Sequence, residues 1–569
     1  MTEVGDSVAA RTNHVLLSVH LSPTMACSMS KLPTLVFPPR TSPTYAPLGI
    51  ATLSAMACQS MAMHDVYDWN LDLWQALLEV SPDGLAASQF FRTDTPLFWH
   101  ETTYSSHREA LHKTGTILRK QQDDSRRYVE TGILDSQLQA SLDLAATRLV
   151  NGERIIGFSV IFPEQLSFAL ALAKYLKESC GSQNTCLIGG AFMSVLNPAI
   201  MLTTFPYIDG LLCGEGDQAF SAILNGAAFG EVPGLWHRHE GSITQTPSAP
   251  FLSEINSLPS PWYGQLRVPS YFNPTPVLSL AGSRGCRWNR CRFCMHNASF
   301  GKHRRMDANI LVSHMELISQ QTGCHHFYLA DQYVTPQQLD ELATEILTRG
   351  LACYYHIMAR SIPDYTPEIL EKAAMSGCCW ISWGMESGSQ KLLDLMNKGT
   401  QVDTAEQVII NAHAAGISNL LMMIFGSPGS TVADLELTFA FLDRIYPFID
   451  AMTNSAFALF ADTPFSRKPQ RYGLEVLNQE VLFSVNGLDV LGPRLSFRRE
   501  GEEDRIESSL GTRELDLWLR RRVWLGEKPF LEGLCCEHFL LHSARRRSCD
   551  HPATPPAGSH DNHWSQPAV

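Results

Sequence analysis

The sequence of 569 residues lacks any apolar run near the roughly 18 residues that a membrane-spanning helix needs. Positive charge is also scarce, because 44 Lys and Arg stand against 57 Asp and Glu, leaving a formal net charge of −13. Proteins that bind nucleic acids present clustered Lys and Arg, so this balance argues against such a partner. No signal peptide is recognisable at the start, so we expect the 15 cysteines to serve as thiols and metal ligands in the cytoplasm. We expect neither nucleic acid nor a membrane as a partner.

The length suits several domains of roughly 100–200 residues each. Residues 1–28 are weakly patterned and form an N-terminal extension of uncertain status. A strand running into a proline turn follows shortly after Met29, which favours Met29 as the start of the folded chain. The alternative is an additional strand at His14–Val19.

Residues 29–250 alternate strand-like and helical patterns, which predicts a parallel sheet with helices on both faces. A polar helical insertion at about 70–150 interrupts this alternation. The proline-rich stretch 251–276 has the character of a linker. The expected strands are Leu35–Phe37, His64–Tyr67, Ile155–Ile161, Thr185–Ile188 and Gly210–Cys213.

From 277 to 460 the chain repeats strand and helix six times. Residues 461–544 depart from this alternation and suggest a mixed C-terminal domain, with Trp518 and Arg520–Arg522 on a helical run. We read that arginine run as a solvated helix face, with an acidic substrate group as the alternative ligand. The polar tail 545–569 is expected to be disordered.

Three cysteines lie within nine residues at Cys286, Cys291 and Cys294, on a loop that leaves a short buried strand. Three thiolates alone do not complete a tetrahedral zinc site, which needs four ligands. An electron-carrying cubane cluster uses four cysteines, so three would leave one iron open. A structural zinc site and incidental cysteines are the less favoured readings.

The spacing C-x4-C-x2-C, with Phe293 just before the last cysteine, resembles the radical S-adenosylmethionine (radical SAM) family, whose commonest first gap is one residue shorter. The resemblance implies a 4Fe-4S cluster on these three cysteines, with S-adenosyl-L-methionine on the open iron. It also implies that 277–460 is a partial (β/α)6 radical SAM barrel, which six strand-helix repeats fit.

Further residues match the branch with elongator-like barrels, and the resemblance gives them roles in binding S-adenosylmethionine. Glu386, in a G-x-E-S-G-S stretch with Ser387, would bind the ribose hydroxyls, and Lys398 the carboxylate. Only Asp331 carries over the polar part of the family's G-G-E motif, since Leu-Ala replaces Gly-Gly. The remaining expected contacts are Arg360, for the ribose or carboxylate, and Gly426, on the adenine side. The alternative for each is a salt-bridged or structural residue at the barrel rim.

The turns of the first domain resemble the cobalamin-binding, Rossmann-like domain that precedes many radical SAM barrels. Glycines at strand ends let the backbone approach a ligand closely. The D-x-H-x-x-G motif that supplies a histidine to cobalt is absent, and the stretch His237–Gly241 is expected to be a surface loop. The alternative is a domain that has kept the fold but lost the corrinoid. The expected cobalamin contacts are Ser159, Gly189, Gly190, Gly214 and Glu215.

The sequence therefore predicts an α/β protein: a doubly wound domain, a partial barrel and a mixed C-terminal domain. The resemblance implies a cobalamin-dependent radical SAM enzyme, with C-methylation of an unactivated carbon in a small molecule or peptide as the expected reaction. A flavodoxin- or ferredoxin-type protein would donate electrons. No catalytic residue is identified. The alternatives are cyclisation, rearrangement or methylthiolation by a radical SAM enzyme, and a non-catalytic corrinoid or iron-sulfur sensor.

Overall fold

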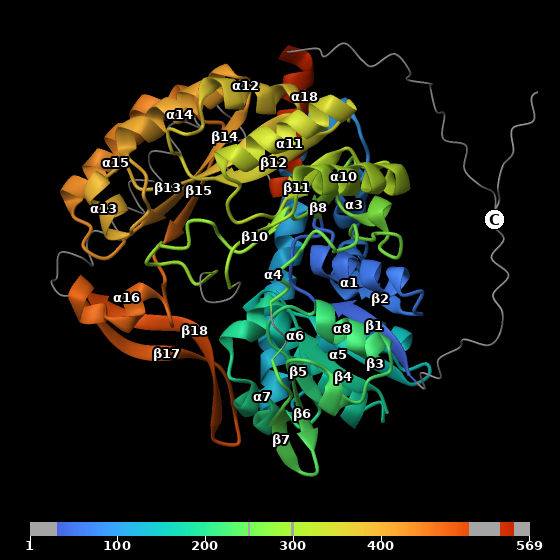
Figure 1. Ribbon diagram of the computed structural model, residues 1–569. Helices are drawn as coiled ribbons and strands as arrows, with labels where there is room; N and C mark the ends of the chain where they lie inside the picture. Colours follow the sequence, from blue (N-terminus) through green and yellow to red (C-terminus); the bar gives the residue numbers. More distant parts are fainter. Residues whose placement is uncertain (1–30, 182, 249–250, 297–300, 500–534, 551–569) are drawn as a thin grey trace, which may run out of the picture.

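The computed structural model describes residues 31–181, 183–248, 251–296, 301–499 and 535–550. Figure 1 shows an N-terminal α/β unit beside a second α/β unit, with the chain of the cysteine motif running between them. The expected strand at His14–Val19, the start at Met29 and the helical run with Trp518 lie outside the described residues. Within the described part, no helix is long and apolar enough to cross a bilayer.

The first unit is built on a seven-stranded sheet in the order β2-β1-β3-β4-β5-β6-β7. The first five strands in the chain pair in parallel, as the alternation predicts. Short apolar runs such as Leu35–Phe37 are buried on both faces, as parallel strands in α/β proteins usually are. The parallel strands are β1 (Leu32–Phe37), β2 (Asp65–Asp68), β3 (Arg154–Ser159), β4 (Thr185–Gly189) and β5 (Gly210–Leu212).

Helices surround this sheet in two groups: α1 packs against α8, whereas α6 packs against α4 and α5. Between β2 and β3 the chain is helical throughout its regular elements. Its 31-residue helix α4 is amphipathic and presents a narrow apolar stripe to the first unit. The helices are α1 (Leu48–Gln59), α2 (Trp69–Leu78), α3 (Pro82–Phe91), η2 (Pro96–Trp99), α4 (Glu101–Thr131), α5 (Ser136–Leu149), α6 (Pro163–Glu178), η3 (Ala191–Val195), α7 (Pro198–Thr204), α8 (Asp217–Leu224) and η4 (Phe229–Glu231).

An antiparallel hairpin extends this sheet where a loop was expected. Strand β6 (Leu235–His239) pairs with β5, and β7 (Ser242–Gln245) pairs with β6. Glu240 and Gly241 both have positive φ, which closes a tight two-residue hairpin turn. The reading of His237–Gly241 as a surface loop is therefore wrong, because these residues form strand and turn, with His237 buried.

The second unit is a six-stranded sheet in the order β15-β14-β13-β12-β11-β8, with all strands parallel. This matches the six strand-helix repeats expected from the sequence. The strands are β8 (Val277–Leu280), β11 (His326–Leu329), β12 (Tyr354–Ala359), β13 (Cys378–Glu386), β14 (Ser418–Phe425) and β15 (Ala451–Ala456). The helices are α10 (Ala308–Thr322), α11 (Pro336–Arg349), α12 (Pro367–Met375), α13 (Gln390–Leu395), α14 (Val402–Ala414) and α15 (Val432–Ile445), with short turns η5 (Val268–Ser270) and η6 (Tyr446–Phe448).

A long antiparallel hairpin follows the barrel, in a three-stranded sheet ordered β16-β18-β17. Its turn at Asn486-Gly487 has positive φ at both residues, the commonest signature of a two-residue hairpin. Figure 1 shows the hairpin reaching from the barrel alongside the first unit. The elements are β16 (Leu459–Phe460), α16 (Pro464–Arg467), η7 (Pro469–Tyr472), β17 (Leu474–Val485) and β18 (Leu488–Arg499).

The last described helix, α18 (Cys536–Asp550), closes the amino-terminal end of the barrel strands. Phe539 packs edge-on against Trp380 near the start of β13, with ring centroids 4.9 Å apart. Tyr104 of α4 and Phe272 of the linker both hydrogen-bond to the His538 ring, so α18 also touches the first unit. Helix α18 thus lies at the end of the barrel opposite the cysteine loop. It also extends beyond residue 545, where the disordered tail was expected to begin.

Candidate functional site

The loop that carries the three cysteines leaves and returns through a narrow neck. Strand β9 (Ser283–Arg284) pairs antiparallel with β10 (Arg304–Arg305). The buried carboxylate of Asp331 accepts hydrogen bonds from the Gly282 backbone N–H, at 2.9 Å, and from the Ser283 hydroxyl. Burial raises the pKa of Asp331 to about 6, although these two donors favour the charged form. Asp331 therefore holds the neck onto the end of β11.

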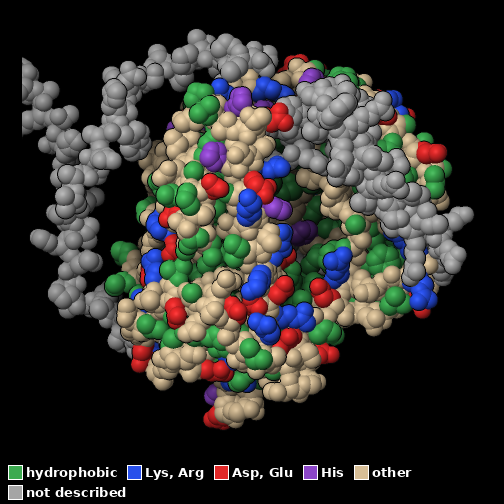
Figure 2. Space-filling view, turned by 180° about the vertical axis from the view of Figure 1, so that it is seen from behind, with side chains coloured by type: hydrophobic (Ala, Val, Ile, Leu, Met, Phe, Trp, Pro, Cys, Tyr) green, Lys and Arg blue, Asp and Glu red, His purple; other side chains and the backbone are tan. Residues whose placement is uncertain are grey.

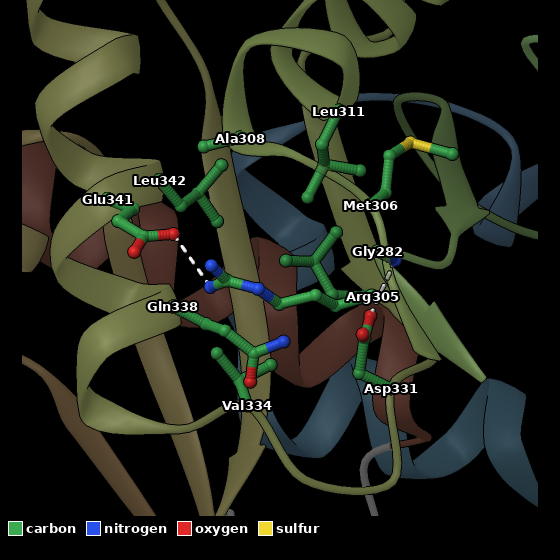
Figure 3. A pocket seen from close by; sticks show the side chains of 11 residues that line it. Gly282, Arg305, Met306, Ala308, Leu311, Asp331, Val334, Gln338, Glu341 and Leu342 are labelled. Atoms are coloured by element: carbon green, nitrogen blue, oxygen red, sulfur yellow. Dashed lines mark hydrogen bonds and ion pairs between the residues drawn. The ribbon is translucent and has the colours of Figure 1, made fainter. Parts of the chain in front are cut away.

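A small pocket lies beside this carboxylate, between the neck and helices α10 and α11 (Figure 3). Arg305 reaches across it to Glu341, with 2.7 Å between Nη1 and Oε2. The pocket walls are mostly apolar at Met306, Leu311 and Leu342. The Asp331 carboxylate, expected at the amino group of S-adenosylmethionine, is thus bonded to the loop backbone and to Ser283 in the structure.

The cysteine loop is docked on the turn that follows α13. The backbone N–H of Arg292 donates to the Met396 carbonyl at 2.9 Å, and Trp288 Nε1 donates to the Asn397 carbonyl at 2.9 Å. In return, Asn397 Nδ2 donates to the Arg290 carbonyl at 3.1 Å. These bonds join two loops that are about a hundred residues apart in sequence. The motif around Lys398 therefore forms the seat of the cysteine loop.

Arg360, at the end of β12, completes this seat. Its guanidinium carbon lies 3.8 Å from the centroid of the Trp288 ring, and it donates to the carbonyls of Lys398 and Gly399 at 3.1 and 2.6 Å. Gly399 has a φ of +68°, and a Cβ there would collide with both Trp288 and Arg360. The hydrogen bonds of Arg360 thus go to backbone carbonyls of the Lys398 turn.

Glu386 and Lys398 form a buried ion pair at the barrel mouth, with 2.6 Å between Oε1 and Nζ. Both side chains are less than a tenth exposed. Although burial lowers it, the Glu386 carboxylate raises the pKa of Lys398 above its ordinary value, so the lysine is charged. A Cβ on Gly384 would lie 2.5 Å from Lys398 Nζ, so the end of the lysine side chain would have to shift to accommodate one. The two expected S-adenosylmethionine ligands are therefore adjacent.

A second small pocket lies at the ends of β13 and β14, lined by Ser387, Gly426 and Thr438 among others. The Ser387 hydroxyl is 3.2 Å from the Thr438 hydroxyl. Gly426 has a φ of +74°, a conformation that favours glycine. The adjacent Ser427 hydroxyl is buried and has no hydrogen-bond partner among the described residues. A donor or acceptor for a ligand is thus available beside the expected adenine site.

The three cysteines are half-buried on the loop between neck and seat. Burial raises the pKa of Cys291 to about 11; Lys398 lowers it, whereas the Cys294 and Cys286 thiols and Glu386 raise it further. These interactions show that the thiols lie near one another. Among the described residues, however, no three Cys, His, Asp or Glu side chains stand close enough to hold a metal ion.

The donor set fits an iron-sulfur cluster in its chemistry, because thiolates are the ligands that such clusters use. Burial raises the pKa of Cys291, so its thiolate would need a bound cation to be favoured. The thiols would have to draw together to share a cluster. Residues 297–300, which follow directly, lie outside the described part.

The glycines expected to approach a corrinoid lie at the carboxyl ends of strands β4 and β5. Gly190 has a φ of +103°, and a Cβ there would overlap the backbone of Val160. Gly214 has a φ of +97°, with open space where a Cβ would be. Ser159, at the end of β3, lies against Gly49 of α1, with 3.8 Å between its hydroxyl and an added Cβ. Ser159, Gly190 and Gly214 are half-buried, and among the glycines just described open space stands only beside Gly214.

Glu215 differs from the rest of this group because it points to the barrel. Its carboxylate lies 2.8 Å from Arg304 Nη2 and 3.3 Å from Arg284 Nη1. Sequence reasoning missed this contact, as it missed the Trp288–Arg360 stack. An R-x-C pattern and a run of arginines around the cysteines were visible, but nothing in the sequence says which acidic residue they meet.

The sequence resembles proteins of known family. Residues 281–442 match the family described as the radical SAM superfamily. The chain is 22% identical over 285 residues to an uncharacterized methyltransferase of Pyrococcus horikoshii, covering 49% of this chain and 61% of that protein. It is 25% identical over 304 residues to the anaerobic magnesium-protoporphyrin IX monomethyl ester cyclase of Rubrivivax gelatinosus, covering 51% and 53%. The chain thus spans little more than half the length of these relatives.

Among solved structures, the cobalamin-dependent S-adenosylmethionine radical enzyme OxsB with aqua-cobalamin bound superposes with a TM-score of 0.60. The sequences are 16% identical, and the match covers 86% of this chain and 67% of that one. It therefore includes both the first unit and the barrel, which confirms the expected fold. Residues 281–442 thus resemble the radical SAM superfamily, and the chain as a whole shares the fold of the cobalamin-dependent S-adenosylmethionine radical enzyme OxsB.

Proposed function

We propose that the protein is a cobalamin-dependent radical SAM methyltransferase that methylates an unactivated carbon of a small molecule or peptide. One observation carries the proposal. The cysteine loop is held between the Glu386–Lys398 pair of the barrel and the glycine-bearing edge of the first unit. A cluster on that loop would face both a site for S-adenosylmethionine and a site for a corrinoid.

Each part of the chain has a role in this proposal. Cys286, Cys291 and Cys294 hold a 4Fe-4S cluster, and Glu386 and Lys398 bind the polar ends of S-adenosylmethionine. When bound, the cluster supplies the electron that cleaves S-adenosylmethionine into methionine and a 5′-deoxyadenosyl radical, and cobalamin supplies the methyl group. The protein's part is to position these groups and exclude water, because the cofactors carry the chemistry.

The pairing of Glu386 with Lys398 gives the site a defined charge before S-adenosylmethionine arrives. The lysine ammonium suits a carboxylate, and the glutamate suits two vicinal hydroxyls, since charge-assisted hydrogen bonds are stronger than neutral ones. Arg360 keeps the Lys398 turn in place through its bonds to the carbonyls of 398 and 399. Binding would exchange the ion pair for bonds to the ligand without leaving either charge bare.

We propose that the site opens to solvent through a hollow on the surface. Seen from behind, the molecule is hollowed near its middle, and Lys, Arg, Asp and Glu side chains gather around the hollow (Figure 2). An electron must also reach the cluster from outside the protein. We propose a flavodoxin- or ferredoxin-type donor and, with the reducing conditions that such a cluster needs, a cytoplasmic location.

A second reaction class is favoured by one of the relatives, which is named as a cyclase rather than a methyltransferase. Cyclisation or rearrangement would use the same radical but transfer no methyl group. The two classes differ in what becomes of S-adenosylmethionine. Methylation consumes it twice, giving S-adenosylhomocysteine and 5′-deoxyadenosine, whereas the other reactions give no S-adenosylhomocysteine.

The test is anaerobic reconstitution with iron, sulfide and hydroxocobalamin, followed by incubation with S-adenosylmethionine labelled on its methyl group and a strong reductant. We expect 5′-deoxyadenosine in every case, and S-adenosylhomocysteine only when the corrinoid is present. Cys294→Ala is the matched control and should give no 5′-deoxyadenosine. A fully reconstituted protein that leaves S-adenosylmethionine intact would contradict an enzymatic role, and 5′-deoxyadenosine without methyl loss would favour the cyclase class.

A further inference from the structure

Two arginines lie at the neck of the cysteine loop, one on each strand. Arg284 ends β9 and Arg304 begins β10, and the two residues are direct partners in the antiparallel ladder. The loop with the three cysteines lies wholly between them in the sequence. Contacts made by these two side chains therefore restrain both ends of the cysteine loop.

Both arginines reach the same turn of the first unit. Arg284 forms a bidentate pair with Asp217, with 2.7 Å from Nη1 to Oδ2 and 2.9 Å from Nη2 to Oδ1. Arg304 pairs with Glu215, with 2.8 Å from Nη2 to Oε1. The two acids flank Gly216, with Glu215 in the turn after β5 and Asp217 at the first position of α8. That turn lies at the carboxyl end of the sheet, where doubly wound folds bind ligands.

The start of the linker closes the same network. The backbone N–H of Leu252 donates to Glu215 Oε2 at 3.1 Å, and its carbonyl accepts from Arg304 Nη1 at 2.9 Å. First unit, linker and barrel therefore meet at one point, although the linker itself contains no strand or long helix.

These four side chains are largely buried, which separates them from ordinary surface ion pairs. Their exposed fractions are 5% for Asp217, 9% for Arg304, 14% for Glu215 and 20% for Arg284. The neighbouring pair Arg305–Glu341, on the same strand β10, is 38% and 36% exposed. Bidentate geometry adds directional specificity, and burial protects the pairs from screening by salt.

We propose that four side chains form a clamp that fixes the ligand edge of the first unit against the neck of the cysteine loop: Glu215, Asp217, Arg284 and Arg304. Ligand binding in one unit then changes the ligand affinity of the other. The identity of the two ligands, a corrinoid and S-adenosylmethionine, rests on the proposed function. The clamp itself rests only on the contacts above. Its residues are positioning residues, because they contact the loop and not the reacting groups.

The consequence of a clamp follows from linkage. If the corrinoid orders the turn between β5 and α8, that turn orders the neck, and the reverse effect must have the same size. The two ion pairs transmit the position of this turn to the neck. Without the pairs, the two sites would bind independently.

Hydrogen exchange of the full-length protein without cofactors tests the clamp directly. Asp217→Asn removes one charge with little change in shape, and Glu341→Gln does the same to the exposed pair on β10. We expect Asp217→Asn to speed exchange at 283–286 and 303–306 about tenfold or more, and Glu341→Gln to leave it within about twofold. Equal effects of the two substitutions would overturn the clamp.

A double variant guards against a general loss of folding. Replacing both partners, in Asp217→Asn with Arg284→Gln, leaves no unpaired buried charge, which is much less costly than removing one partner. The double variant should therefore exchange more slowly at the neck than Asp217→Asn alone. Strictly additive effects of the two substitutions would mean that the side chains do not act as a pair, and would overturn the proposal.

Coupling between the sites is measured with hydroxocobalamin and S-adenosylmethionine on the reconstituted protein. The dissociation constant of each is determined alone and with the other at saturation. We expect each to tighten the other about fivefold or more in the wild type, within the usual range for coupled sites, and to lose this effect in Glu215→Gln. Two ligands that bind without coupling in the wild type would overturn the clamp. Failure of both to bind would refute the proposed function instead, and hydrogen exchange would still decide whether the clamp exists.

Discussion

Lys398 Nζ lies 2.6 Å from Glu386 Oε1, in a pair that is buried at the mouth of the barrel. Glu386 holds this position with a φ of +65°, which is uncommon for a residue other than glycine. Such backbone strain of about 1–3 kcal/mol persists where the surrounding structure over-determines it, and it is frequent at functional sites. We therefore propose that the pair is part of the functional site.

Replacing Glu386 by Gln should weaken binding of S-adenosylmethionine about ten- to a hundredfold, since a charge-assisted hydrogen bond contributes about 1.5–3 kcal/mol. It should also destabilise the protein by about 3–5 kcal/mol, because Lys398 would remain as a buried charge without its partner. Titration calorimetry and urea unfolding measure the two effects.

Glu341→Gln is the control for this variant, because it removes the carboxylate of an exposed ion pair on the same domain. Exposed pairs contribute about 0–1 kcal/mol, so its stability should barely change. Unaltered affinity for S-adenosylmethionine in Glu386→Gln would return the residue to a purely structural role.

Replacing any one of Cys286, Cys291 and Cys294 by Ala should abolish stable cluster binding. Each change leaves two thiolates where three are already the minimum for a cluster with one open iron. Iron and sulfide content per chain after anaerobic reconstitution is the measurement. Cys324→Ala is the matched control, because Cys324 is a buried cysteine outside the loop. A triple variant with a full complement of iron would show that the metal lies elsewhere.

Trp288→Ala should reduce cluster retention although it removes no ligand. The ring stacks on Arg360 and its N–H binds the Asn397 carbonyl, so its loss frees the cysteine loop from its seat. A cation–π contact contributes about 0.5–2 kcal/mol, and the hydrogen bond about 1 kcal/mol more.

Trp288→Phe separates these two contributions, because it keeps an aromatic face for Arg360 and loses the N–H. We expect cluster content per chain to fall in the order wild type, Trp288→Phe, Trp288→Ala. Full retention by the alanine variant would mean that the cluster alone orders the loop.

Asp331 should make stability depend on pH in an unusual direction. Burial raises its pKa from 3.8 to about 6, so the folded protein holds a proton that the unfolded chain releases between these values. Its contribution to stability is therefore greatest below about pH 4 and declines by about 3 kcal/mol as pH rises through 6.

Asp331→Asn has no such proton, and it keeps an oxygen that can accept from the Gly282 N–H. The difference in unfolding midpoint between this variant and the wild type should thus shift in the variant's favour from pH 4.5 to pH 7. A difference that is constant over this range would show that Asp331 is ionised throughout.

Cobalamin, if bound by the first unit, should carry no histidine from the D-x-H-x-x-G motif on its cobalt, because the sequence has none. A cobalt without a strong lower ligand favours the reduced form that accepts a methyl group. Paramagnetic resonance of the Co(II) state is the measurement. Hyperfine splitting from a protein imidazole nitrogen would contradict the prediction, and a preparation that retains no corrinoid would remove the basis for methylation.

Local patterns in the sequence determined much of this protein. Alternation of strand and helix predicts both parallel sheets. The cysteine spacing at 286–294 and the stretch with Glu386 and Lys398 indicate the family, because each of these signals is local in the sequence. The sequence analysis did not predict the two hairpins, although Glu240-Gly241 and Asn486-Gly487 are turn residues, because the strand-helix alternation indicated parallel sheets alone.

Only the tertiary structure decided what the charged side chains meet. Glu215 was expected at a corrinoid and is found against Arg284 and Arg304, while Trp288 lies on Arg360. Helix α18, far along the chain, closes the opposite end of the barrel. Such contacts join residues from about 70 to several hundred positions apart, so they depend on how two folded units pack and leave no trace in local periodicity.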